Sequence, residues 1–111
     1  MDDITVKFMD WACKPEVGMY NNGRKAMCII DIEDQSPVAT ATVNIPGEHC
    51  DDDEIFVKDY SENEGMVTAL MNAKLIKEPH RTVRTGFVAV PVCRLTEQGK
   101  ALWEVEDAKD S

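Results

Sequence analysis

The chain has 111 residues, of which 43% are hydrophobic and 30% are charged, and 12 basic against 21 acidic residues give a net charge of −9. This length allows one domain with a single modest core, and the composition is that of a folded globular protein, so wholesale disorder is excluded. Because a negative protein repels nucleic-acid phosphates, DNA or RNA is not expected as the main ligand without a locally basic patch.

Two expectations concern the cellular compartment. The opening residues Met1-Asp2-Asp3 lack the basic and apolar regions of a signal peptide, and no apolar run approaches the roughly 18 residues that span a bilayer. We therefore expect a cytoplasmic protein without membrane contact, in which thiols stay reduced. No Cys-x-x-Cys pair is present, so the cysteines are expected to be free thiols rather than metal ligands, and no cofactor is expected. They are Cys13, Cys28, Cys50 and Cys93.

The first half of the chain predicts strands. Apolar and polar residues alternate over residues 4–8, the period of a half-buried strand. The Asn22-Gly23 step lies between two apolar runs and favours a tight antiparallel hairpin. A further strand is expected over residues 38–45, where Pro46-Gly47 ends it, and a short one over residues 55–57. The short turns between these runs indicate an antiparallel meander.

A helix is predicted over residues 61–75. Ser61 and Glu64 match the capping box, in which each side chain accepts a hydrogen bond from the backbone N–H of the other residue. Apolar residues then recur at helical spacing, which predicts a buried stripe, and Pro79 is expected to close the segment. The stripe consists of Met66, Ala69, Leu70 and Ala73.

The last third returns to β character and ends in a tail. Residues 82–95 predict a strand that is apolar on both faces over residues 87–93, where Pro91 indicates an edge strand or a bulge. Residues 96–106 predict a short helix that Gly99 weakens. The expected fold class is therefore α+β: an antiparallel sheet of about five to six strands, one main helix packed on it, and a short C-terminal helix. Residues 1–95 are expected to form the domain and residues 96–111 an extension.

The most distinctive feature is an acidic stretch from Glu48 to Glu64, which holds eight carboxylates and one cation, Lys58. Consecutive aspartates cannot all face one ion, so a metal site is not expected. The paired carboxylates Asp59 and Glu62 have no partner nucleophile, histidine or oxyanion device, so catalysis is not expected either. We expect a surface for a protein partner. The candidate residues are Asp51, Asp52, Asp53, Glu54, Asp59, Tyr60 and Glu62.

An alternative is a DNA-binding surface on the basic segment 74–94, which holds five cations and one acid. Residues 95–102 resemble the Leu-Thr-x-x-Gly-x-x-Leu segment that follows the wing in winged-helix regulators. That resemblance implies DNA binding, with Arg81, Arg84 and Arg94 as candidate residues. Residues 1–58, however, predict strands where winged-helix domains need two further helices, and the net charge opposes DNA binding.

A second resemblance covers residues 4–95. The Asp-Tyr-Ser-Glu-Asn-Glu-Gly sequence of residues 59–65, with residues 39–46 and 86–95, resembles an uncharacterised family of small proteins. That family is encoded on conjugative elements, plasmids and phages of gut-associated bacteria. The resemblance implies an accessory protein of a mobile genetic element, without catalysis.

Together these observations predict a non-enzymatic protein of a phage or mobile element that binds a basic host or element protein through an acidic face. A sharper version is a DNA-mimicking inhibitor of a host defence nuclease, in which clustered carboxylates occupy a groove built for phosphates. Such binding weakens as salt rises.

Overall fold

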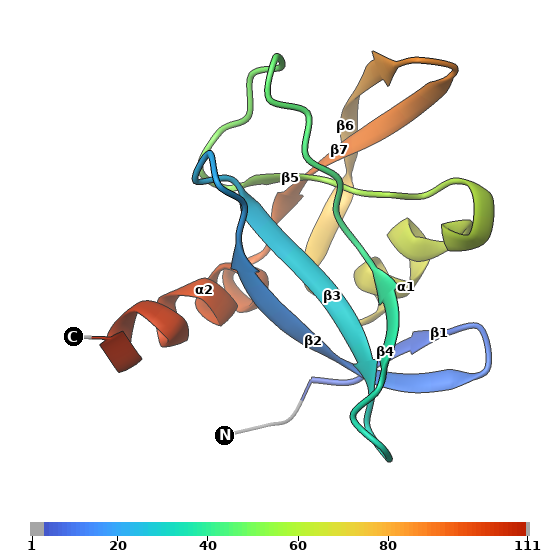
Figure 1. The fold of residues 1–111 in the computed structure, drawn as a ribbon, viewed down its shortest axis with the longest axis vertical. Coiled ribbons are helices and arrows are strands. Elements are labelled where there is room, and N and C mark those ends of the chain that lie inside the picture. Colours follow the sequence, from blue (N-terminus) through green and yellow to red (C-terminus); the bar gives the residue numbers. More distant parts are fainter. Residues whose placement is uncertain (1–3, 111) are drawn as a thin grey trace.

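The structure is a computed structural model that describes residues 4–110, with side chains as far as residue 104. In this part of the chain, seven antiparallel strands form two sheets, and two α-helices pack against them (Figure 1). The α+β class predicted from the sequence is confirmed, with a second sheet that the sequence did not predict.

The first sheet has the order β1-β2-β3-β4, with β1 at Val6–Phe8, β2 at Trp11–Met19, β3 at Lys25–Asp31 and β4 at Pro37–Thr40. The hairpin predicted at Asn22-Gly23 is confirmed, since Met19 pairs with Lys25 and Gly23 takes a φ of 84°. Strand β2 begins earlier than the sequence indicated and contains Pro15. Strand β1 stops at the pair Val6–Cys13, so Pro15 has β3 as its only neighbouring strand in this sheet.

The strand predicted over residues 38–45 is divided between the two sheets. Strand β4 ends at Thr40, and the next residues cross to the second sheet, where Thr42 bridges Val57 and the Val43 N–H donates to the Phe56 carbonyl at 3.1 Å. The second sheet has the order β5-β7-β6, with β5 at Glu54–Phe56, β6 at Ile76–Thr85 and β7 at Val88–Leu95. This crossing lets both sheets contribute to the main core.

The predicted helix is shorter than its apolar pattern. A single 3₁₀ turn, η1, covers Ser61–Asn63, and α1 covers only Met66–Asn72. The predicted capping box does not form, because Ser61 has a left-handed φ of 55° and neither helical segment has a side-chain cap from its N-cap residue. The buried stripe is largely confirmed: Met66, Ala69 and Leu70 are buried.

Pro79 does not end the helix. Lys74 ends it, with a left-handed φ of 63° and the Leu75 N–H bonded back to the Leu70 carbonyl at 3.0 Å. Pro79 lies inside β6, where the pairing with β7 is irregular on both sides of it. The run predicted as one strand over residues 82–95 is a hairpin, in which β6 and β7 are joined by a turn between Thr85 and Val88.

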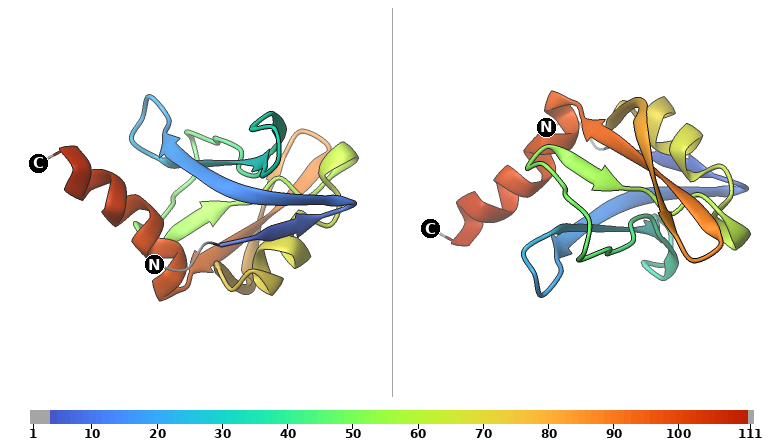
Figure 2. Two further views of the ribbon diagram at one scale, coloured as in Figure 1. Left: turned by 90° about the horizontal axis from the view of Figure 1, so that it is seen from below. Right: turned by 90° about the horizontal axis from the view of Figure 1, so that it is seen from above.

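Helix α2, Glu97–Asp110, confirms the predicted C-terminal helix. It lies beside the β2–β3 hairpin (Figure 2), and its Trp103 is buried and donates from Nε1 to the Gly18 carbonyl at 2.9 Å. Gly99 is required here, since a Cβ at this position would lie 2.2 Å from the Leu75 carbonyl oxygen. Neither helix in the described residues has the length and apolar character needed to cross a membrane.

Candidate functional site

The acidic stretch does not form one continuous face. Strand β5 runs through its middle and carries its two ends to different parts of the molecule (Figure 1). Residues 46–53 form a loop beside the β2–β3 hairpin, whereas residues 59–65 lead into α1 on the other side. The sequence brings these carboxylates together, and the fold separates them.

Glu54, the last acid of the Asp51–Glu54 run, is buried with 1% of its side chain exposed. Its Oε1 accepts from Arg81 Nη2 at 3.0 Å and from the Asp51 N–H at 2.8 Å, and its Oε2 contacts His80 Nε2 at 2.5 Å. Burial by itself would raise the pKa of Glu54, but the hydrogen bonds from Arg81, the Asp51 backbone and His80 outweigh it and lower the pKa to about 2. Glu54 is therefore a structural anion.

Two other acids of this run, Asp51 and Asp53, are also paired. Arg94 binds Asp53 at 2.7 Å and Asp51 at 3.4 Å, and it stands opposite Glu54 in the β5–β7 register. Two of the three arginines proposed for DNA, Arg81 and Arg94, are thus held by the acids proposed for a basic partner. The predicted acidic surface and the predicted basic surface therefore neutralise part of each other's charge.

Basic side chains hold the backbone of the acidic loop as well. Arg24 donates to the Glu48 carbonyl at 2.5 Å, Lys25 to the Asp52 carbonyl at 2.6 Å and Arg81 to the His49 carbonyl at 2.7 Å. These contacts fix the loop through its carbonyl groups. The Glu48 and Asp52 side chains are exposed and have no ion-pair partner within residues 4–104.

Asp59 has a structural role that the sequence did not reveal. Its two carboxylate oxygens accept from the Gly65 N–H at 2.9 Å and the Val67 N–H at 2.8 Å, which are free donors at the start of α1. Asp59 therefore caps the start of the helix, the role that was predicted for Ser61 and Glu64. Glu62 pairs with Lys58 at 3.1 Å, and the Lys58 ammonium also lies 5.9 Å from the Tyr60 ring centre.

The β6–β7 hairpin presents residues that the sequence analysis missed. Gly86 and Phe87 form its two-residue turn, in which Gly86 takes a φ of 60° and Phe87 is fully exposed, at 105% of its reference area. Arg84, the third arginine proposed for DNA, is exposed on the same hairpin. A sequence signal existed: glycine at the first position of a two-residue turn between two β-branched runs is typical of a type II′ hairpin.

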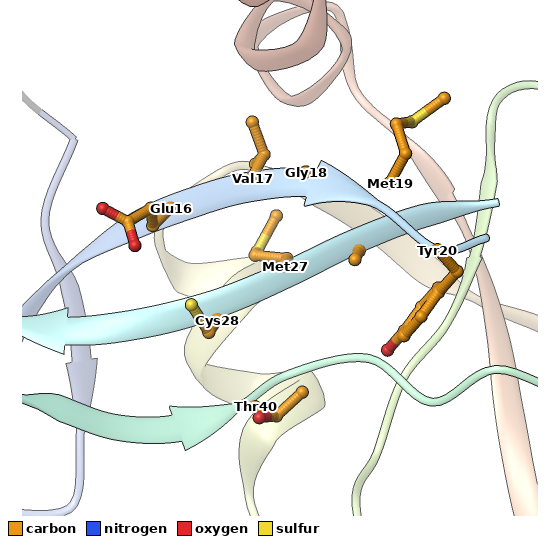
Figure 3. Close-up of a pocket in the computed structure, with 9 residues that line it drawn as sticks. Glu16, Val17, Gly18, Met19, Tyr20, Met27, Cys28 and Thr40 are labelled. Carbon is orange, nitrogen blue, oxygen red and sulfur yellow. The ribbon is translucent and has the colours of Figure 1, made fainter. Parts of the chain in front are cut away.

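A shallow depression of about 370 Å³ lies over strands β2, β3 and β4 (Figure 3). The pairs Glu16–Cys28 and Gly18–Ala26 line it, with Glu16 at one end and Tyr20 at the other. Burial, with the nearby Glu16 carboxylate, raises the pKa of the Cys28 thiol, which stays protonated at neutral pH. Among the side chains of residues 4–104 that line it, Glu16 is the only charged one, and these residues include no acid–base pair.

The cysteines are free, as expected: Cys13 and Cys93 are buried, and Cys28 and Cys50 are half-buried. Burial raises the pKa of Cys93 to about 12. Among the side chains of residues 4–104, no group of three or more metal-ligating residues comes together.

Comparison of the chain with models of protein families, with curated proteins and with solved structures gave no significant match.

Proposed function

We propose that this protein is a non-enzymatic binding protein that docks on a basic surface of a protein partner through its acidic loop, residues 46–53. The observation that carries the proposal is the way the loop is held. Three basic side chains bind its carbonyl groups from the body of the protein, and the Glu48 and Asp52 carboxylates are left exposed. A loop fixed in this way loses little conformational entropy when it binds.

The length of the connection supports the same conclusion. Residues 41–53 join β4 to β5 without a regular strand or helix of their own, apart from the isolated bridge at Thr42. Connections of about this length are uncommon in small domains and are usually functional. This connection is also packed, since Val43, Ile45 and Cys50 contact the small core cluster of the second sheet.

The sharper DNA-mimic version stays a prediction. A mimic of DNA needs many free charges at regular spacing, and here Asp51, Asp53 and Glu54 are paired with arginines. The resemblance to mobile-element proteins adds a bacterial host as the setting of the proposal.

The test uses two double variants from the same acidic stretch. The immobilised protein would be exposed to a lysate of a gut-associated bacterium at low and high salt, and bound proteins identified by mass spectrometry. We expect Glu48→Gln with Asp52→Asn to lose a basic partner that the wild type retains at low salt, because both free carboxylates are removed.

The matched control is Glu62→Gln with Glu64→Gln, which removes the same charge from the other end of the stretch. This control should retain the partner. Equal loss in both double variants would show a general charge effect, and retention in both would overturn the proposal.

A further inference from the structure

The β6–β7 hairpin tip lies at the same end of the molecule as the acidic loop (Figure 1). One face of the hairpin is packed: Val83 and Val90 are buried in the second core cluster, against which Cys50 of the acidic loop and Ile45, just before the loop, also pack. The hairpin stem and the loop therefore support each other.

Phe87 is outside this packing. It is fully exposed, although it follows Gly86 in a turn whose geometry is fixed by strand pairing on both sides, Thr85 with Val88 and Arg84 with Ala89. A large aromatic side chain on a rigid stem offers apolar contact area with little entropy to lose, which is typical of the residues that anchor protein interfaces.

We propose that Phe87 is an anchor that inserts into an apolar pocket of a protein partner, beside the basic surface that the acidic loop contacts. This proposal deepens the function proposed above and rests on it for the identity of the partner. The loop and the hairpin tip would then form one composite docking surface.

The charges near the hairpin tip favour a protein partner over nucleic acid, a lipid surface or a second copy of the chain. The net charge of −9 and the free carboxylates of the acidic loop repel nucleic-acid phosphates and anionic lipid headgroups, and they outnumber the one exposed arginine next to the hairpin turn, Arg84. They also oppose a second copy of the same chain, because two acidic loops would approach each other. A protein with a basic surface and an apolar pocket is the occupant that these charges favour.

The test places a photo-crosslinking benzoylphenylalanine at position 87 and, as a matched control, at position 9. Met9 is also exposed, at 62%, but lies in the β1–β2 turn. After irradiation in the host cell, we expect position 87 alone to crosslink to a protein of basic isoelectric point. Combining the position-87 probe with Glu48→Gln and Asp52→Asn should lower the crosslink yield at least about fivefold.

A crosslink at position 87 to a second copy of the chain, to nucleic acid or to lipid would overturn the proposal, as would equal crosslinking from position 9. A Phe87→Ser variant separates the two proposals. Loss of the partner with an unchanged melting temperature supports the anchor. Retention of a partner that the loop variant loses would overturn the anchor and leave the loop function standing.

Discussion

Glu54 shows how one residue can change the meaning of a sequence pattern. It is the fourth of four consecutive acids, a run that predicts solvated surface, yet its side chain is 1% exposed and is contacted by Arg81 and His80. A buried ion pair adds little net stability compared with a well-packed apolar pair, but removing one partner leaves the other charge buried and is costly.

Replacing Glu54 by glutamine should therefore destabilise the protein strongly. The neutral amide leaves Arg81 facing a buried site without a counter-charge, and we expect the free energy of unfolding at pH 7 to fall by about 3 kcal/mol or more. Urea unfolding followed by circular dichroism measures this. Glu62→Gln is the control, because Glu62 is exposed and its pair with Lys58 contributes less than about 1 kcal/mol.

The same variant should change the pH dependence of stability. The pKa of Glu54 is lowered from 4.5 to about 2 in the folded protein, so its ionised form stabilises the fold above pH 4.5, and this contribution is lost as the pH falls from 4.5 towards 2. The Glu54→Gln variant should have a flatter stability curve in this window. Parallel curves for the two proteins would contradict the assignment of Glu54 as a buried anion.

At the scale of elements, the start of α1 is set by a residue six positions before Gly65. Gly65 itself precedes the helix with a φ of 99° and has no side chain to cap it, so the first donors of the helix depend on the Asp59 carboxylate. Ser61 and Gly65 have left-handed conformations, which bend the chain back so that the Asp59 carboxylate reaches the N–H groups of Gly65 and Val67.

Asp59→Ala should consequently lower the free energy of unfolding by about 1–2 kcal/mol, the usual cost of losing a helix cap. Glu64→Ala is the informative control, because a capping box predicts a loss there and the structure shows no such contact. Thermal denaturation of the three proteins decides the point. A larger loss for Glu64→Ala than for Asp59→Ala would contradict the cap.

Gly99 leads to a prediction that runs against helix propensity. Alanine is better than glycine within a helix by about 1 kcal/mol, yet a Cβ at Gly99 would lie 2.2 Å from the Leu75 carbonyl oxygen. We expect Gly99→Ala to lower the free energy of unfolding by about 1–3 kcal/mol, because α2 must move away from the turn after α1. Gly47→Ala, whose Cβ would meet nothing within 4 Å, should have little effect. A melting temperature for Gly99→Ala equal to that of the wild type would refute this.

These elements also show what the sequence can and cannot predict. Alternation and the Asn22-Gly23 step act locally, so β1, the β2–β3 hairpin and β5 were predicted correctly. The pairs Glu54–Arg81 and Asp53–Arg94 join residues that are 27 and 41 positions apart, so no local sequence pattern predicts them. The crossing of the chain between the sheets after Thr40 likewise depends on distant residues. The sequence predicted which charged residues belong to the candidate site, but only the structure shows which of them form ion pairs.

On the scale of the whole molecule, the main core is shared by the two sheets, and the second sheet has a small cluster of its own. The main core cluster combines Val6 and Met27 from the first sheet with Ile55 and Leu95 from the second. Trp103 from α2 belongs to the same cluster, so the segment predicted as an extension contributes to the packing that joins the sheets. Its contact with Gly18 ties the end of the chain to β2.

Trp103→Ala should therefore destabilise the entire protein rather than free one helix. Loss of a buried aromatic side chain costs about 3–5 kcal/mol, and because the sheets share the main core, a single cooperative transition is expected at lower urea. Trp11 in β2 remains as a fluorescent reporter of the first sheet, and far-ultraviolet circular dichroism reports on all elements. Trp103→Phe, which keeps a ring but loses the bond to the Gly18 carbonyl, should lie between wild type and Trp103→Ala. Two separate transitions, or a loss below about 1 kcal/mol, would instead mean that residues 96–111 are a dispensable extension and that the domain ends at residue 95.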